Sequence, residues 1–264
     1  MLGGFTSLKE NPGTDWGERM LNTVASQTIR HLFTRSDSVD VVVRCYPSSK
    51  LLQGSIDSFK VSGTGLVIRR EFRAEEMSFE TDAVSIDFSS VLKGKIRLKQ
   101  PTQAIAQVTL TENDINDAFK AELVRKRLEN LSNPELTELS GGEPISFTDV
   151  HVNLLPNNQV KMQAKAELPE QGLVPLSMTC TLDVERRRRI RFNNPQFQPE
   201  EIPESVQAVS RTLTTALAEI LDNMVDLDRF NLDGVTLRIN RLETQGEKLI
   251  FSGYAQIERI PENP

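Results

Sequence analysis

The sequence predicts an α+β fold in which antiparallel sheets curl around long amphipathic helices. Most of the chain alternates apolar and polar residues with a period of two, and Gly, Pro and Ser separate the alternating runs. Such alternation is typical of antiparallel strands with one buried face. Three longer segments instead repeat apolar residues at helical spacing. The two periodicities together predict a mixed fold rather than an all-helical or all-strand one.

The chain is expected to open with a flexible tail over residues 1–12. A first helix is predicted over 14–34, where Thr14 or Asp15 can cap the free amides of the first turn. Its apolar stripe consists of Leu21, Val24, Thr28 and Leu32.

A first series of strands follows this helix. The segment VSGTGLVI is interpreted as a strand with a bulge, because Gly63 and Gly65 interrupt its alternation. The other predicted strands lie over residues 39–45, 77–79, 84–88, 96–99 and 104–110.

A second helix is predicted over 112–131, with Thr111 as its N-cap and acidic residues in its first turn. The segment 132–144 is interpreted as a linker between two similar halves of one elongated domain spanning 13–264. A chain of 264 residues can form a single domain with a large core.

The second half repeats the plan of the first. A third helix is predicted over 203–223, because Pro203 suits a first helical turn and apolar residues recur at helical spacing after it. A hairpin over residues 235–255 is expected to end the chain. The strands before the helix are predicted over residues 147–154, 160–166 and 176–184.

Composition excludes several classes of function. The formal net charge of −6 argues against nucleic acid as a partner, since that role needs a basic face. Cys45 and Cys180 each lie in an apolar alternating run, so both are expected to be reduced and buried. The chain has no apolar run long enough for a membrane-spanning helix and no signal peptide, which predicts a cytoplasmic protein.

Catalytic signatures are absent from the sequence. It has no GxSxG elbow, no phosphate-binding GxxxxGK[ST] loop, no HExxH and no CxxC. The acidic loop over 222–234 departs from the calcium-binding pattern, so it is interpreted as a solvated turn. We therefore expect neither an enzyme nor a bound metal or cofactor, although a carboxylate pair formed only by folding would escape this search.

The third helix is the first candidate functional feature. Periodicity alone favours an ordinary packed stripe, but the stripe could also form one wall of an apolar groove. Met162 and Met178 on the preceding strands would add an adaptable surface to that wall. The predicted wall on the third helix consists of Val206, Val209, Leu213, Leu217 and Ile220. Small residues expected on the facing strands would leave room beside it; they are Ala104, Ala106, Ala164 and Ala166.

The run VERRRRIRF is the second candidate. On an extended strand, Arg187, Arg189 and Arg191 would project to one side, where guanidinium groups can hold phosphate oxygens. The same residues could instead protect an edge strand from aggregation, and we leave both interpretations open.

Three stretches of the chain form a pattern when taken in order. They are the stretch from Pro47 to Val61, the strand from Met77 to Phe88, and the run from Ala104 to Phe119, in which a strand passes directly into TLTENDINDAF. This pattern resembles the LmeA-like family of bacterial phospholipid-binding proteins. At the level of pattern, the resemblance covers most of the chain.

The resemblance implies a tubular, BPI-like lipid-binding architecture and a phospholipid or similar apolar ligand. It also implies an inner or thylakoid membrane surface as the partner of a cytoplasmic protein, and the row of Arg187, Arg189 and Arg191 would favour contact with an anionic membrane. The expected function is lipid shuttling or sensing. The alternatives are a scaffold with a filled core and an accessory factor in membrane lipid metabolism.

Overall fold

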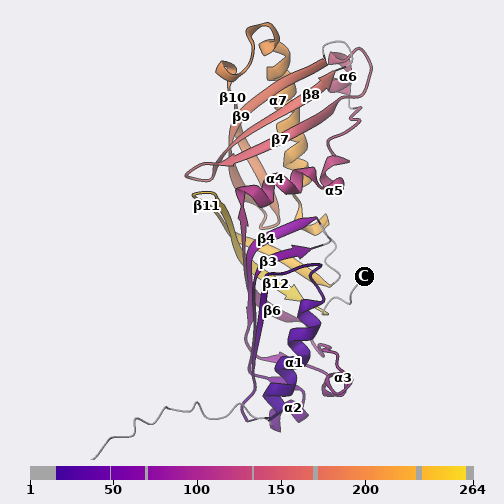
Figure 1. Ribbon diagram of the computed structural model, residues 1–264, viewed down its shortest axis with the longest axis vertical. Helices are drawn as coiled ribbons and strands as arrows, with labels where there is room; N and C mark the ends of the chain where they lie inside the picture. Colours follow the sequence, from indigo (N-terminus) through magenta and orange to yellow (C-terminus); the bar gives the residue numbers. More distant parts are fainter. Residues whose placement is uncertain are drawn as a thin grey trace, which may run out of the picture.

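The computed structural model describes residues 16–47, 49–68, 71–132, 134–168, 172–229 and 234–259. The expected tail at 1–12 and the expected cap at Thr14 or Asp15 lie outside these residues. The described chain forms antiparallel sheets and α-helices in a molecule longer along one axis than across it (Figure 1). The prediction of an α+β fold with antiparallel strands is therefore confirmed.

Two sheets contain most of the described strands. The larger sheet has the spatial order β1-β3-β4-β6-β12-β11 and the smaller has the order β10-β9-β8-β7, with β2 and β5 paired separately. The larger sheet consists of β1 (Ser38–Arg44), β3 (Ser58–Ile68), β4 (Phe72–Thr81), β6 (Thr102–Thr111), β12 (Lys248–Ile257) and β11 (Val235–Gln245). The other strands are β7 (Ser146–Leu154), β8 (Gln159–Leu168), β9 (Gly172–Glu185), β10 (Arg189–Phe197), β2 (Ser55–Ile56) and β5 (Val84–Ser85).

Two helices each cover one large sheet. α1 (Trp16–Arg30) packs on β1 of the six-stranded sheet, and α7 (Gln207–Met224) packs on β9 and β10 of the four-stranded sheet. The shorter α-helices are α2 (Ser49–Leu52), α3 (Phe88–Val91), α4 (Glu112–Lys120), α5 (Glu122–Arg125) and α6 (Pro134–Leu139). Single 3₁₀ turns are η1 (Pro199–Glu201), η2 (Glu204–Val206) and η3 (Leu227–Arg229).

The prediction of one continuous helix over 112–131 is wrong. α4 ends at Lys120, and Ala121 adopts an extended backbone with φ −61° and ψ 139°. The amide of Glu122 donates to the carboxylate of Glu71 at 3.0 Å, so a residue from the β3–β4 connection satisfies an amide that a continuous helix would bond internally. This contact comes from a distant part of the chain and leaves no trace in local periodicity.

The other two predicted helices are shorter than expected. α1 ends at Arg30, and α7 begins at Gln207 because the preceding Val206 has a non-helical backbone with φ −120° and ψ 4°. Pro203 precedes the turn η2 instead of opening the helix. Within the described residues, α1 contains 15 residues and α7 contains 18, fewer than the sequence predicted for each helix.

Two strands predicted in the first half are much reduced. The run over 84–88 ends early because the Asp87 side chain accepts from the amide of Ser89 and caps α3. Residues 96–99 form only one bridge, between Ile86 and Leu98. The segment 132–144, expected to be a linker, contains α6 and the buried side chain of Leu136.

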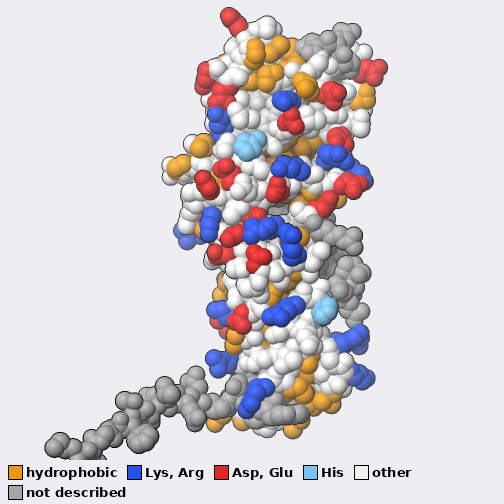
Figure 2. Space-filling model, in the orientation of Figure 1, with side chains coloured by type: hydrophobic (Ala, Val, Ile, Leu, Met, Phe, Trp, Pro, Cys, Tyr) orange, Lys and Arg blue, Asp and Glu red, His pale blue; other side chains and the backbone are white. Residues whose placement is uncertain are grey.

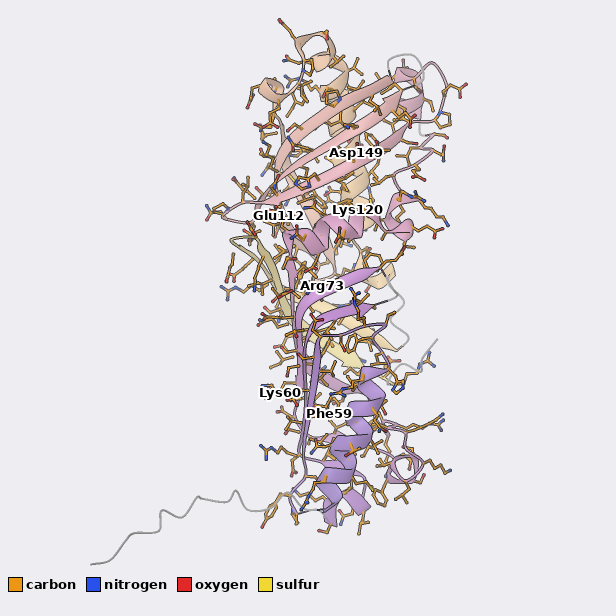
Figure 3. The ribbon with its side chains drawn as sticks, in the orientation of Figure 1. Phe59, Lys60, Arg73, Glu112, Lys120 and Asp149 are labelled. Atoms are coloured by element: carbon orange, nitrogen blue, oxygen red, sulfur yellow. The ribbon has the colours of Figure 1, made fainter. Side chains whose placement is uncertain are left out.

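α4 joins the two large sheets. It follows β6 directly, and Thr111 and Asp114 form a capping box at the junction. The buried Asn116 side chain donates to the carbonyl of Val152 at 3.0 Å and accepts from its amide at 2.7 Å. Asn116 thus satisfies both backbone groups of one residue on β7, as a neighbouring strand would. Figure 3 shows Glu112 and Lys120 along α4, with Arg73 on the adjacent β4.

The C-terminal hairpin makes a second connection between the sheets. β12 pairs with β6 of the larger sheet, although the sequence placed this hairpin with the second half. Thr244 on β11 donates from its hydroxyl to the carbonyl of Leu155 at 2.7 Å and accepts from the amide of Asn158 at 2.9 Å. These bonds fasten the hairpin to the β7–β8 connection.

Buried apolar residues form two large clusters. One lies between α7 and the four-stranded sheet and includes Leu242 and Leu249 from the C-terminal hairpin. The other lies between α1 and β1, β3 and β4. Cys45 belongs to the second cluster and Cys180 to the first, and both are buried free thiols as predicted.

Candidate functional site

The residues predicted to form an apolar wall lie together in the cluster under α7. Leu213 and Leu217 are fully buried there, as are Met162 on β8 and Met178 on β9. The other three, Val206, Val209 and Ile220, are half-buried and pack against the same cluster. The structure therefore brings all seven residues together, but the interface between α7 and its sheet is closely filled around Leu213.

Two hydroxyl groups lie on the buried face of α7. Ser210 donates to the carbonyl of Pro175 on β9 at 2.7 Å, which anchors the helix to the sheet. Thr214 lies one turn later, and its buried hydroxyl has no hydrogen-bond partner within the part of the chain that the structure describes. A buried, unpaired hydroxyl costs about 1–3 kcal/mol, so this contact between α7 and its sheet is not optimised for stability.

A second apolar surface lies on the six-stranded sheet. Across neighbouring strands, Ala106 pairs with Phe79, Phe79 with Val61 and Val61 with Val41, so these side chains lie on one face of the sheet. The helix α1 covers the same face at the edge formed by β1. α1 packs on β1, whereas β12 and β11 lie at the opposite edge of the sheet. We call this part of the sheet the alanine face; it consists of Ala104, Ala106, Ala255, Phe79, Val235, Leu237 and Ile257.

The alanine face combines small and large side chains. Its three alanines are buried, while Phe79, Leu237 and the other large residues are only half-buried. Ala104 and Ala106 were expected to lie opposite the third helix; that expectation is wrong, because β6 belongs to the other sheet. Ala164 and Ala166 on β8 do lie in the cluster under α7. Sequence reasoning missed the alanine face as a separate surface, although small residues alternate visibly along β6.

The predicted row of three arginines on one strand is wrong. Residues 186–188 form the turn between β9 and β10, and Arg187 has a left-handed backbone with φ +60°. Its guanidinium lies 5.7 Å from the ring centroid of Tyr254. Arg189 and Arg191 do share one side of β10, and both lie 3.6 Å from the Glu185 carboxylate.

The last turn of α7 and the acidic loop after it supply the partners of these arginines. Arg191 pairs with Asp222 at 2.8 Å, Arg189 pairs with Asp226 at 3.3 Å, and Arg188 pairs with Asp228. Asp233, the remaining acidic residue noted in this loop, lies outside the described residues. The guanidinium groups of Arg189 and Arg191 are therefore engaged by protein carboxylates.

The pKa values of Asp226 and Asp228 are lowered in the folded protein. Burial of Asp226 disfavours its ionisation, but the amide of Asp228 and the Arg189 guanidinium outweigh burial and hold its pKa below the ordinary value. Hydrogen bonds from Arg188 and Arg238 likewise lower the pKa of Asp228. Within the described ranges, no three His, Cys, Asp or Glu side chains are grouped to hold a metal ion.

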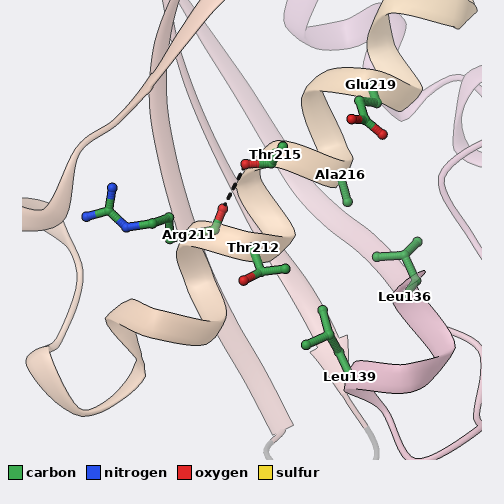
Figure 4. Close-up of a pocket in the computed structure, with 7 residues that line it drawn as sticks. All are labelled: Leu136, Leu139, Arg211, Thr212, Thr215, Ala216 and Glu219. Atoms are coloured by element: carbon green, nitrogen blue, oxygen red, sulfur yellow. Dashed lines mark hydrogen bonds between the residues drawn. The ribbon is translucent and has the colours of Figure 1, made fainter.

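A small cleft lies between α6 and α7 (Figure 4). Leu136 and Leu139 of α6 face Thr212 and Ala216 of α7, and Arg211 points away from them. Its volume is about 270 Å³. Pockets for drug-sized ligands span about 300–1,000 Å³, so this cleft is too small for a phospholipid with two acyl chains.

Comparison with known proteins assigns the chain to a family. A family model described as LmeA-like phospholipid-binding matches residues 13–253, a range that begins before α1 and ends within β12. No curated protein and no solved structure gives a significant match to the chain. Among the described helices, none is long and apolar enough to cross a membrane.

Proposed function

The chain belongs to the LmeA-like phospholipid-binding family, and from this premise we propose that it binds phospholipid in an apolar groove and carries or senses that lipid at a membrane surface. The observation that carries the proposal is the extent of the family match, over residues 13–253. A match of this extent includes both large sheets and α7. The proposed activity therefore belongs to the whole fold.

Acyl chains need an apolar wall. Moving one CH₂ group from an apolar environment into water costs about 0.8 kcal/mol, so a chain leaves a bilayer only for a comparable surface. We place the acyl-chain site on the alanine face. Its large apolar residues, such as Phe79 and Leu237, are only half-buried and could therefore contact an acyl chain.

The wall on α7 is the rival site. Leu213 and Leu217 already fill the interface between α7 and its sheet, so a lipid could enter only if the helix moved away. The unpaired Thr214 hydroxyl weakens that interface and is the observation that favours such movement. Arg189 and Arg191, two of the three predicted headgroup contacts, hold buried or half-buried carboxylates of the protein itself, and Arg187 lies over the ring of Tyr254.

A matched pair of alanine substitutions distinguishes the two sites. Ala106 and Ala164 are both buried strand alanines, one on the alanine face and one under α7. We expect the purified parent protein to retain phospholipid, measured by native mass spectrometry and by phosphate analysis of extracted lipid. Ala106→Leu should lower the amount of bound lipid, whereas Ala164→Leu should chiefly destabilise the fold, by about 1–3 kcal/mol through overpacking.

If Ala164→Leu lowered the amount of bound lipid and Ala106→Leu chiefly destabilised the fold, the lipid site would be assigned to the wall on α7. A parent protein that retains no phospholipid after purification and takes none up from vesicles would contradict the proposal and leave a scaffold with a filled core. Turnover of the added phospholipid during the same incubation would instead indicate an enzyme of lipid metabolism.

A further inference from the structure

One end of the molecule carries exposed apolar side chains. This end, at the bottom of Figure 1, contains α2 and α3 and the loops around them. Tyr46 is 83% exposed, Leu52 70% and Leu92 64%. We call residues 44–47, 49–57 and 82–99 the tip. Three large apolar side chains this exposed at one end of a soluble fold mark an interaction surface.

The fold holds these three side chains outward. Each directly follows a residue that is at most 3% exposed, namely Cys45, Leu51 and Val91. These three buried residues belong to the cluster under α1. Because the buried neighbour fixes the backbone, the exposed side chain cannot turn inward without pulling its neighbour out of the core.

The loops of the tip form one rigid unit. β2 pairs with β5, the amide of Ile86 donates to the carbonyl of Gly54 at 2.7 Å, and the amide of Asp87 donates to the carbonyl of Arg97 at 2.8 Å. Gly54 has φ +78°, and a Cβ atom there would lie 2.2 Å from the carbonyl oxygen of Ile86. Only glycine allows this close approach of the two loops.

The tip is basic in an acidic protein. It contains six Lys or Arg and three Asp, a net charge of +3, so the rest of the chain carries −9. Two of the three acidic residues are occupied within the tip: Asp57 pairs with Lys50 at 2.6 Å, and Asp87 caps α3. Lys93, Lys95 and Lys99 are exposed. Figure 2 shows orange and blue side chains together at this lower end of the molecule.

We propose that the tip docks the protein onto an anionic phospholipid bilayer. Tyr46, Leu52 and Leu92 enter the interfacial region of the bilayer, and Lys93, Lys95 and Lys99 contact lipid phosphates. This inference rests on the proposed function, since a lipid carrier must meet the membrane that supplies its ligand. It places membrane contact at the tip and away from Arg187, Arg189 and Arg191.

The chemistry of the tip suits a fluid lipid surface. Tyrosine partitions to the membrane interface, where its ring is apolar and its hydroxyl group stays hydrated. Lysines bury their methylene stems while their ammonium groups reach lipid phosphates. Each lysine near an anionic surface strengthens binding by about five-fold, so the substitution of two should weaken it by about thirty-fold. A folded protein partner would instead require a complementary pocket for each side chain.

Vesicle co-sedimentation tests the proposal. The probes are vesicles of phosphatidylcholine alone and of phosphatidylcholine with phosphatidylglycerol, at low and high salt. The parent should bind the anionic vesicles more tightly, and salt should weaken that binding. The double variants Leu52→Asp/Leu92→Asp and Lys93→Gln/Lys95→Gln should each lower the partition coefficient, the second by about thirty-fold at low salt.

Control variants change similar residues away from the tip. Leu173→Asp alters an apolar side chain that is 58% exposed on β9. Lys120→Gln/Lys126→Gln removes two exposed lysines near α4 and α5. Both controls should bind vesicles as the parent does. If an aspartate variant has a lowered melting temperature, Leu52→Ser/Leu92→Ser replaces it.

The results separate the two proposals. Docking by the tip would be contradicted if the tip variants bound vesicles as tightly as the parent does. It would also be contradicted if the parent bound neutral and anionic vesicles equally. Phospholipid retained in the purified protein is measured in the same preparations and should be equal in the parent and the Lys93→Gln/Lys95→Gln variant. If the purified parent protein contained no phospholipid, the proposed function would be refuted, independently of the vesicle-binding results.

Discussion

At the scale of single residues, opposite charges distant in sequence neutralise each other. Asp226 is buried after α7 and is held by Arg189 on β10, while the exposed side of the same loop pairs Asp228 with Arg188 and Arg238. A buried carboxylate is stable only when charged partners and amide donors compensate for its lost hydration. Arg188, Arg189 and Arg238 therefore stabilise the fold by compensating the charges of Asp226 and Asp228.

Asp226→Asn should destabilise the protein. The substitution leaves Arg189 without its buried partner, and we expect a loss of about 2 kcal/mol, between the costs of breaking an exposed and a fully buried pair. Urea unfolding followed by circular dichroism measures this loss. Glu243→Gln is the control: its partner Arg241 is largely exposed, so stability should change by less than about 1 kcal/mol.

The effect of Asp226→Asn should depend on pH. The pKa values of Asp226 and Asp228 are lowered in the folded protein, so their charges stabilise the fold fully above the unfolded pKa of about 4. This stabilisation is lost as the pH falls through the folded values. The stability difference between parent and Asp226→Asn should therefore shrink below about pH 4, and a difference that grew there would contradict the assignment.

At the scale of elements, contacts between segments decide where helices begin and end. α4 ends at the point where the carboxylate of Glu71 accepts a hydrogen bond from the amide of Glu122. The helix packs on β7 through Glu112 and Asn116. The carboxylate of Glu112 accepts from the amide of Leu154 at 2.8 Å. One side of this short helix thus continues the hydrogen bonding of the sheet.

Asn116→Ala tests this docking. It removes the only described side chain that bonds both backbone groups of Val152, and leaving two buried groups unpaired should cost about 2–4 kcal/mol. Asp117→Ala is the control, since Asp117 is exposed and pairs only with Lys120 among the described residues. Thermal unfolding should show a much lower melting temperature for Asn116→Ala than for Asp117→Ala. Equal melting temperatures would mean that α4 does not hold the sheets together.

At the scale of the whole molecule, two connections join the sheets. α4 follows β6 and packs on β7, and the C-terminal hairpin pairs with β6 while it bonds to the β7–β8 connection. Apolar residues of that hairpin also complete the cluster under α7. We therefore expect the two sheets to unfold together.

Hydrogen exchange should reveal this dependence. Peptides from β6 and from β9 should lose protection together as urea is added, because opening either sheet breaks contacts of the shared hairpin. Thr244→Val, which removes the hydroxyl bonds to Leu155 and Asn158, should lower protection in both sheets. Protection that falls in β6 while β9 is unchanged would show that the sheets unfold separately.

The sequence by itself determined the class of fold and most of its strands. Alternation located β1, β6, β7, β8 and β9 and the C-terminal hairpin, because burial of one face imposes period two on the residues of each strand. It also determined that Cys45 and Cys180 are buried and that Leu213, Leu217, Met162 and Met178 belong to an apolar interior. These properties are local, since each residue's neighbours in sequence carry the signal.

Tertiary structure alone decided which elements meet. The sequence could not show that β12 pairs with β6, that Ala106 and Ala164 lie in different sheets, or that Arg189 pairs with Asp226. It also could not show that α2 and α3 lie at one end of the molecule, where Leu52 ends α2 and Leu92 follows α3, with both side chains exposed. Pairing partners are chosen by the joint burial of segments far apart in the chain, and periodicity within one segment carries no information about its partner.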